Sequence, residues 1–150
     1  MIPANIIAIV KNIATAKGLD AALVCAIVEQ ESGGNAWAIR WEPEFYMRYI
    51  VPLKLADQTE ETARAMSWGL MQVMGQVARE HGYMGALPAL CDPATGIAVG
   101  CDVFNTKVDI ASRSVSSPAG LVEKALLLWN GGGNPNYAAQ VLARVPSYQS

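Results

Sequence analysis

Hydrophobic positions along the chain follow helical spacing, and strand-like alternation is scarce. Capping residues and glycines delimit the periodic stretches. Residues 35–58 are interrupted by Pro43 and Pro52, and we expect them to be irregular with short helical turns. The pattern predicts helices over residues 4–17, 21–32, 59–65, 67–81, 93–112, 118–129 and 136–143. Because no sheet of consequence is indicated, the fold class is predicted to be all-α and bundle-like.

The predicted helix over residues 21–32 is the most apolar part of the chain. Asp20 is suited to cap its start, and Gly33 and Gly34 are suited to end it. Residues 21–28 read Ala-Ala-Leu-Val-Cys-Ala-Ile-Val, so this segment is apolar on every side. A helix of that kind belongs in the middle of a domain.

Composition narrows the classes of protein to consider. The chain has 150 residues, of which 52% are hydrophobic and 16% charged, and no repeat or linker divides it. We therefore expect a single domain over residues 1–150 with its own core, acting as a monomer. Its apolar runs are far shorter than the roughly 20 residues that a membrane span needs, so no span is expected. The net charge is −2 without a basic stripe, which argues against nucleic acid as a partner.

Cysteine and histidine positions give no sign of a metal site. Cys25 lies inside the apolar helix and is predicted to be a buried small hydrophobic residue. Cys91 and Cys101 are either free or, if the protein works outside the cytosol, joined in a disulfide. No His, Cys or Asp cluster has the spacing of metal ligands, so we expect neither a metal nor another cofactor.

Two carboxylates stand at the C-terminal end of the apolar helix, Glu29 and Glu31. The partial negative charge of a helix C-terminus disfavours a carboxylate, and burial beside apolar residues disfavours it further. Both effects raise a carboxyl pKa, as a general acid working near neutral pH requires. On position alone, two solvated glutamates on a fraying helix end are the alternative.

Four short blocks give these carboxylates a context. Glu31-Ser-Gly-Gly-Asn35 resembles the Glu-Ser-x-x-Asn motif of the lytic transglycosylases of the soluble lytic transglycosylase (SLT) type, relatives of goose-type lysozyme. Ser67-Trp-Gly-Leu-Met-Gln-Val-Met74 is similar to the family's Gly-Leu-Met-Gln-x-Met segment. Trp129-Asn-Gly-Gly132 resembles its Tyr-Asn-Ala-Gly, and Tyr137 lies in a segment resembling Tyr-Val-x-x-Val. The blocks follow the family order over residues 21–145.

The resemblance implies a lysozyme-like helical domain whose central buried helix carries the catalytic Glu31. The implied partner is the glycan strand of peptidoglycan, cleaved at the β-1,4 bond between N-acetylmuramic acid and N-acetylglucosamine. Glu31 would protonate the glycosidic oxygen and then act as base. No second carboxylate is needed, because the sugar's N-acetyl group stabilises the cationic intermediate and its 6-hydroxyl forms a 1,6-anhydro product.

The resemblance also implies roles for other residues. Gln72 and Met74 would line the cleft near the sugar, and Ser67 belongs to the same block. Asn130 and Tyr137 would hold the substrate or orient Glu31.

Three departures from the family pattern stand out. Gly75 follows Met74 where the family usually has proline. Trp129 replaces the usual tyrosine, which removes a hydroxyl that could contact the substrate or the catalytic glutamate. The first two blocks usually lie closer together than here, where residues 36–66 intervene.

The intervening segment is rich in aromatic residues. Exposed rings stack on sugar faces, so Trp41 is a candidate substrate contact, with ordinary core packing as the alternative. Glu42 is a second candidate in the cleft. Glu42 or Glu44 would position a water in a true hydrolase; the alternatives are a solvated charge or a salt bridge to Arg40 or to Arg48.

We therefore predict a peptidoglycan lytic transglycosylase, with a goose-type muramidase using the same Glu31 as the nearest alternative. A catalytically idle glycan-binding or assembly module is the alternative from another class. No signal peptide is visible, so we expect a protein made in the cytoplasm or a trimmed mature form, acting on the cell wall. A phage endolysin or virion lysin fits this, as does a processed bacterial wall-remodelling enzyme.

Overall fold

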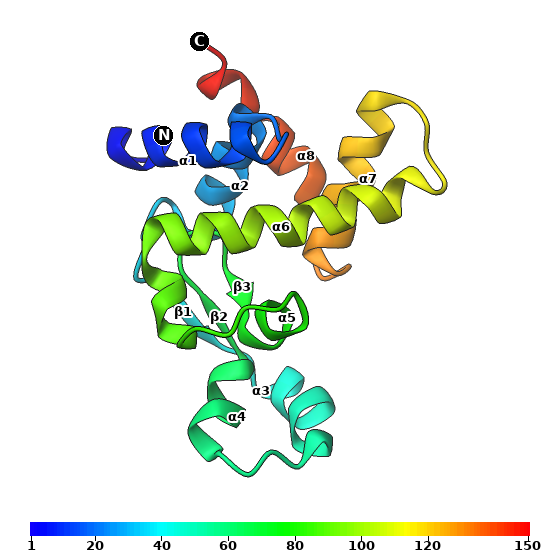
Figure 1. The fold of residues 1–150 in the computed structure, drawn as a ribbon. Helices are drawn as coiled ribbons and strands as arrows, with labels where there is room; N and C mark the ends of the chain where they lie inside the picture. The colour runs from blue at the N-terminus through cyan, green and yellow to red at the C-terminus, as the bar shows by residue number, and fades with distance from the viewer.

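The structure is a computed structural model that describes residues 1–150. It is mainly helical, as predicted, but it also contains a small three-stranded sheet (Figure 1). The helices are α1 (Ala4–Ala16), α2 (Ala21–Ser32), α3 (Pro43–Phe45), α4 (Gln58–Arg64), α5 (Gly75–Glu80), α6 (Pro93–Ser112), α7 (Pro118–Asn130) and α8 (Tyr137–Leu142). The strands are β1 (Ile39–Trp41), β2 (Met66–Trp68) and β3 (Val73–Met74). Shorter helical turns are η1 (Tyr46–Ile50), η2 (Val51–Leu53), η3 (Leu87–Cys91) and η4 (Val145–Tyr148).

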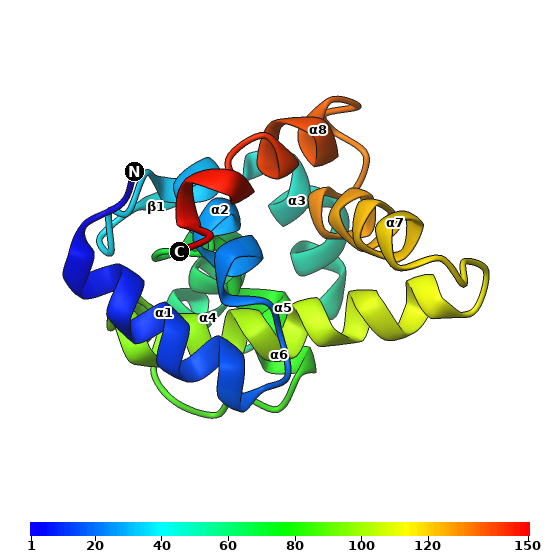
Figure 2. The same ribbon diagram turned by 90° about the horizontal axis from the view of Figure 1, so that it is seen from above.

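Helix α2 lies at the centre of the molecule, as its apolar sequence predicts. Residues 22–28 are all buried. The helices α1 and α8 and the C-terminal turn η4 pack against it (Figure 2). The Asp20 side chain accepts a hydrogen bond from the Ala22 amide at the start, and Gly33 ends the helix with a φ of 60°. Both capping predictions are confirmed.

The predicted helix over residues 67–81 is wrong in its first half. Residues 66–74 form β2, a turn and β3, and only α5 is helical. Two residues of the turn have positive φ, 70° at Gly69 and 51° at Gln72, which a right-handed helix does not allow. Gly69 is also required by space, because a Cβ there would collide with the carbonyl oxygen of Leu90.

The sheet is antiparallel throughout, in the order β1-β2-β3. Ile39 pairs with Trp68, and Ser67 pairs with both Arg40 and Met74. This pairing joins the segment 36–66 to the second family block, so the extra residues extend from the sheet rather than from the helical core.

In Figure 1, α6 crosses the middle of the molecule, with α1, α2 and α8 above it and the strands, α3, α4 and α5 below.

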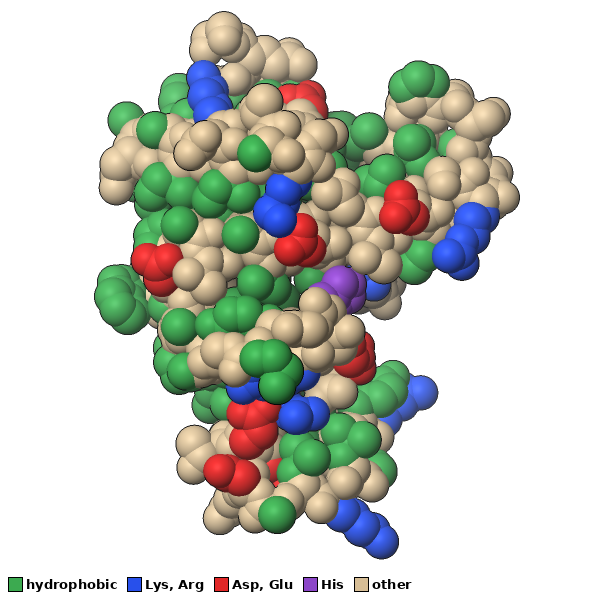
Figure 3. All heavy atoms as spheres, viewed as in Figure 1, with side chains coloured by type: hydrophobic (Ala, Val, Ile, Leu, Met, Phe, Trp, Pro, Cys, Tyr) green, Lys and Arg blue, Asp and Glu red, His purple; other side chains and the backbone are tan.

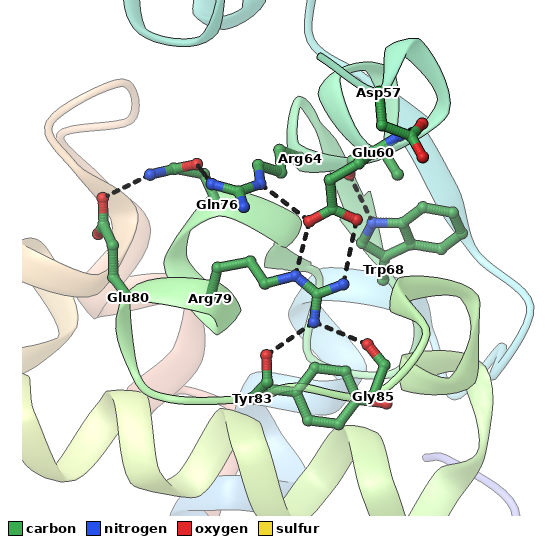
Figure 4. Close-up of polar contacts among 10 residues, drawn as sticks. Asp57, Glu60, Arg64, Trp68, Gln76, Arg79, Glu80, Tyr83 and Gly85 are labelled. Carbon is green, nitrogen blue, oxygen red and sulfur yellow. Dashed lines mark hydrogen bonds and ion pairs between the residues drawn. The ribbon is translucent and has the colours of Figure 1, made fainter. Parts of the chain in front are cut away.

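A charged cluster holds α4 to α5 (Figure 4). Arg79 donates to both oxygens of Glu60, at 2.7 and 3.1 Å, and Arg64 donates to the same carboxylate at 2.9 Å. Arg79 also donates to the carbonyls of Tyr83 and Gly85. These contacts lower the pKa of Glu60 to about 2, with Arg79 as the main cause.

The space-filling view shows the lower part of the molecule separated by an indentation from the arm formed by α6 and α7 (Figure 3).

All three cysteines are buried and free. Cys25 therefore packs as predicted, and of the two alternatives for Cys91 and Cys101, the structure has the unpaired one. No helix of the structure is both long and apolar enough to cross a membrane.

Candidate active site

Glu31 lies in the last turn of α2, where the buried helix reaches the surface. Two side chains donate hydrogen bonds to its Oε1: the Tyr137 hydroxyl at 2.5 Å and the Trp129 indole nitrogen at 3.1 Å. Oε2 has no protein partner. The two oxygens of this carboxyl group are therefore held in different environments.

Burial raises the pKa of Glu31 above its ordinary value. The hydrogen bonds from Tyr137 and Trp129, and the positive charge of Arg40, act in the opposite direction but do not outweigh burial. Burial and, after it, the neighbouring carboxylate raise the pKa of Tyr137. Tyr137 therefore stays a hydrogen-bond donor to higher pH than an ordinary tyrosine.

Glu31 borders a cleft of about 380 Å³ that lies where the sheet, α5, α6 and α7 meet. Besides Glu31, its wall consists of Arg40, Glu42, Ser67, Gln72, Val73, Met74, Val77, Val103, Lys107, Trp129 and Asn130. This volume suits part of a sugar chain. Two larger hollows, of about 640 and 730 Å³, contain neither Glu31 nor its partners. The smaller cleft is the candidate active site, because it contains Glu31, a carboxyl group whose pKa burial raises and which two side chains hold in place.

The turn between β2 and β3 brings Gln72 to the cleft in a strained conformation. Its side-chain amide donates to the carbonyls of Ala38 and Gly69, both at 2.9 Å, and these bonds offset the cost of its positive φ. Ser32 fastens the same turn to α2, since its hydroxyl donates to the carbonyl of Leu70 at 2.8 Å. The two family blocks are thereby held at a fixed separation.

The remaining predicted residues divide into two groups. Ser67 and Met74 line the cleft side by side, with Oγ and Sδ 3.1 Å apart. Asn130 also lines it and donates to the carbonyl of Asn134, which holds the glycine loop after α7. Tyr137 is buried beneath Glu31 and is not part of the cleft wall, so of its two predicted roles the geometry fits orientation of Glu31.

Two candidate residues of the aromatic segment lie differently with respect to the cleft. Trp41 is not part of the cleft wall; its ring packs against Tyr46 with centroids 5.2 Å apart, and its contact with substrate stays a prediction. Glu42 does lie in the wall, but it is paired with Arg40 at 3.0 Å. Glu44 is exposed and is not part of the wall.

The expectation for Glu29 is also corrected. The Tyr148 hydroxyl donates to its Oε2 at 2.6 Å, and this contact is the main reason why the pKa of Glu29 is lowered rather than raised. Trp129 lacks the hydroxyl of the family's usual tyrosine, but its indole nitrogen donates a hydrogen bond to Glu31 in its place. Lys107 and Arg40 were not expected in the cleft, because neither belongs to a family block.

Comparison with protein-family models gives one match, to the transglycosylase SLT domain, over residues 8–140. The chain belongs to this family. Neither the comparison with curated proteins nor that with solved structures gives a significant match. The matched range contains Glu31 and every residue of the cleft wall. Membership implies a peptidoglycan-cleaving transglycosylase that acts on the cell wall.

The structure explains one way in which this SLT domain departs from its family. Gly75, where the family usually has proline, begins α5 directly against the end of α4. A Cβ at this position would collide with the carbonyl oxygen of Ala63 and lie 2.9 Å from the Cα of Arg64. The close approach of α4 to α5 therefore requires glycine here.

Proposed function

We propose that residues 1–150 act as a peptidoglycan lytic transglycosylase domain in which Glu31 is both the general acid and the general base. The bond broken is the β-1,4 link between N-acetylmuramic acid and N-acetylglucosamine, and the product is a 1,6-anhydro sugar. The observation that carries the proposal is the asymmetry of Glu31. Tyr137 and Trp129 both donate to Oε1, so a proton on this carboxyl group resides on Oε2.

The first step uses the raised pKa of Glu31, which keeps the group protonated to higher pH than an ordinary glutamate. Oε2–H donates its proton to the glycosidic oxygen as the bond to the anomeric carbon breaks. The N-acetyl group of the muramic acid residue stabilises the positive charge that develops on that carbon. The carboxylate left behind keeps its two hydrogen bonds to Oε1, which limit the cost of its charge in a half-buried site.

In the second step the carboxylate acts as base. Oε2 removes the proton from the 6-hydroxyl of the same sugar while the hydroxyl oxygen attacks the anomeric carbon. This closes the 1,6-anhydro ring and returns Glu31 to its acid form, so no water is consumed. The pairing of Glu42 with Arg40 and the exposure of Glu44 support this route over one in which a second carboxylate activates water.

Mass spectrometry of products from digested murein sacculi tests the proposal, with the Glu31→Gln variant as blank. We expect anhydro ends in the wild-type digest and none above background in the blank. Reducing ends would identify a muramidase that uses the same cleft. Absence of any cleavage by the wild type would identify a glycan-binding or assembly module instead.

A further inference from the structure

The charges in the cleft wall do not balance. Four ionisable side chains line it: Glu31, Arg40, Glu42 and Lys107. Arg40 and Glu42 neutralise each other in an ion pair at 3.0 Å. Glu31 is uncharged in its acid form. Lys107 makes no hydrogen bond or ion pair with the protein, so it leaves one uncompensated positive charge in the cleft that is ready for catalysis.

The position of Lys107 follows from α6. Val103 and Lys107 are four residues apart and so lie on the same face of the helix, and both contribute to the cleft wall. Val103 is buried, Lys107 is half-buried, and Val77 contributes to the same wall. A half-buried lysine beside apolar residues keeps its ammonium group in contact with water.

Two other lysines show what is unusual here. Lys17 pairs with Asp102 at 2.6 Å, and Lys124 donates to the Ser114 hydroxyl at 2.7 Å. Lys107 has no such partner in the protein, although it is half-buried in the cleft wall. An ammonium group has three donors and no acceptor, so the ligand that best complements it is an anion.

We infer that Lys107 binds a carboxylate of the glycan substrate and thereby selects murein over neutral glycans. This inference rests on the proposed function and deepens it. The glycan of murein differs from chitin by the lactyl ether of muramic acid. Its carboxyl group is free in strands stripped of peptide, and in other strands it is amide-linked to a stem peptide that carries carboxylates of its own. Either source supplies the charge that the wall lacks.

Binding measurements in the Glu31→Gln background test this without turnover. The ligands are chitohexaose, which carries no carboxylate, peptide-free murein oligosaccharides, and peptide-bearing ones. Lys107→Gln is compared with Lys107→Arg, which keeps the charge, and with Lys11→Gln, a matched change at an exposed lysine on α1 away from the cleft. Calorimetry gives the dissociation constants at low and high salt.

We expect Lys107→Gln to weaken binding of a carboxylate-bearing glycan by about threefold to tenfold at low salt, with a smaller effect at high salt. Chitohexaose binding should not change, Lys107→Arg should retain most of the affinity, and Lys11→Gln should behave as the parent. A loss confined to peptide-free strands assigns the lactyl carboxylate, and a loss confined to peptide-bearing strands assigns the stem.

An unchanged affinity for all three glycans, or an equal loss for chitohexaose, overturns the role of Lys107 while leaving the proposed function in place. Failure of the parent to bind any of the three ligands overturns both.

Discussion

The last turn of α2 exposes two carboxylates to two different regions of the molecule. Glu29 and Glu31 are two residues apart, about 200° around the helix, and share the same unfavourable helix terminus. Glu29 faces the C-terminal turn η4, and Glu31 borders the cleft. The pKa of Glu29 is lowered and that of Glu31 is raised.

The difference arises from what each region supplies. At Glu29, Tyr148 donates to one oxygen and the Met1 amino group to the other, and Arg144 adds positive charge. At Glu31, burial is the largest effect, and both donors go to one oxygen. Position on a helix therefore does not determine whether a carboxyl group suits acid catalysis. The neighbours determine it, and they hold Glu29 in its charged form.

The sharpest test of this contrast is a pair of isosteric substitutions. Glu31→Gln should reduce murein cleavage by about 10³-fold, because the amide cannot deliver a proton. Its single oxygen still accepts from Tyr137 and Trp129, so the variant should fold normally by circular dichroism. Glu29→Gln should keep cleavage within about twofold of wild type, since Glu29 is outside the cleft. Comparable losses in both variants would mean that the two glutamates do not divide their roles in this way.

The same pair separates the two regions by the pH dependence of stability. Glu29 has a folded pKa below its ordinary value of 4.5, so its contribution is present above that pH and is lost as the pH falls through the folded pKa. Glu31 has a folded pKa above 4.5, so its contribution is present below that pH and is lost as the pH rises through the folded pKa.

Urea unfolding from acid to neutral pH measures both. Near pH 7, Glu29→Gln should be destabilised by about 1–2 kcal/mol, because a charged hydrogen bond with Tyr148 is lost. Glu31→Gln should instead be more stable than wild type by about 0.5–2 kcal/mol, since the variant no longer holds a charge in a half-buried site. Both differences should shrink toward low pH. If Glu31→Gln instead becomes less stable relative to the wild type as the pH rises, the cleft does not disfavour the charged form of Glu31.

The sequence predicts one of these regions well and the other poorly. Helix α2 and its ends are found because Asp20, Gly33 and the apolar run act locally. Glu31, Ser67, Gln72, Met74 and Asn130, which the family blocks single out, line one cleft, and their roles toward substrate stay predictions. The environment of Glu29 is not predictable in this way, because its main partner Tyr148 is 119 residues distant along the chain.

Other errors have the same origin in contacts between distant segments. Residues 67–74 have a helical pattern of apolar side chains, but the chain turns there because Ala38 accepts from the Gly69 amide and the Gln72 side chain. Trp129 differs from the family in type yet still supplies a hydrogen-bond donor, which only its distance to Glu31 reveals.

The finest test concerns Trp129 alone. Trp129→Phe removes the weaker of the two hydrogen bonds to Oε1, and that bond lowers the pKa of Glu31, so the pKa should rise. The general acid must be protonated, and activity falls as the pH rises through its pKa. The alkaline limb of the rate profile should therefore move to higher pH, by less than about one unit, the equivalent of one hydrogen bond.

Trp68→Phe is the matched control, because it removes an indole hydrogen bond to the carbonyl of Ala63, away from Glu31. This variant should lose stability but leave the alkaline limb where it is. An identical shift in both variants would mean that the limb reports loosening of the fold. If the alkaline limb stays in place in Trp129→Phe, the indole hydrogen bond does not affect the pKa of Glu31, and Tyr137 is the only hydrogen-bond donor that does. The replacement of the family's tyrosine by Trp129 would then have no catalytic consequence at this carboxyl group.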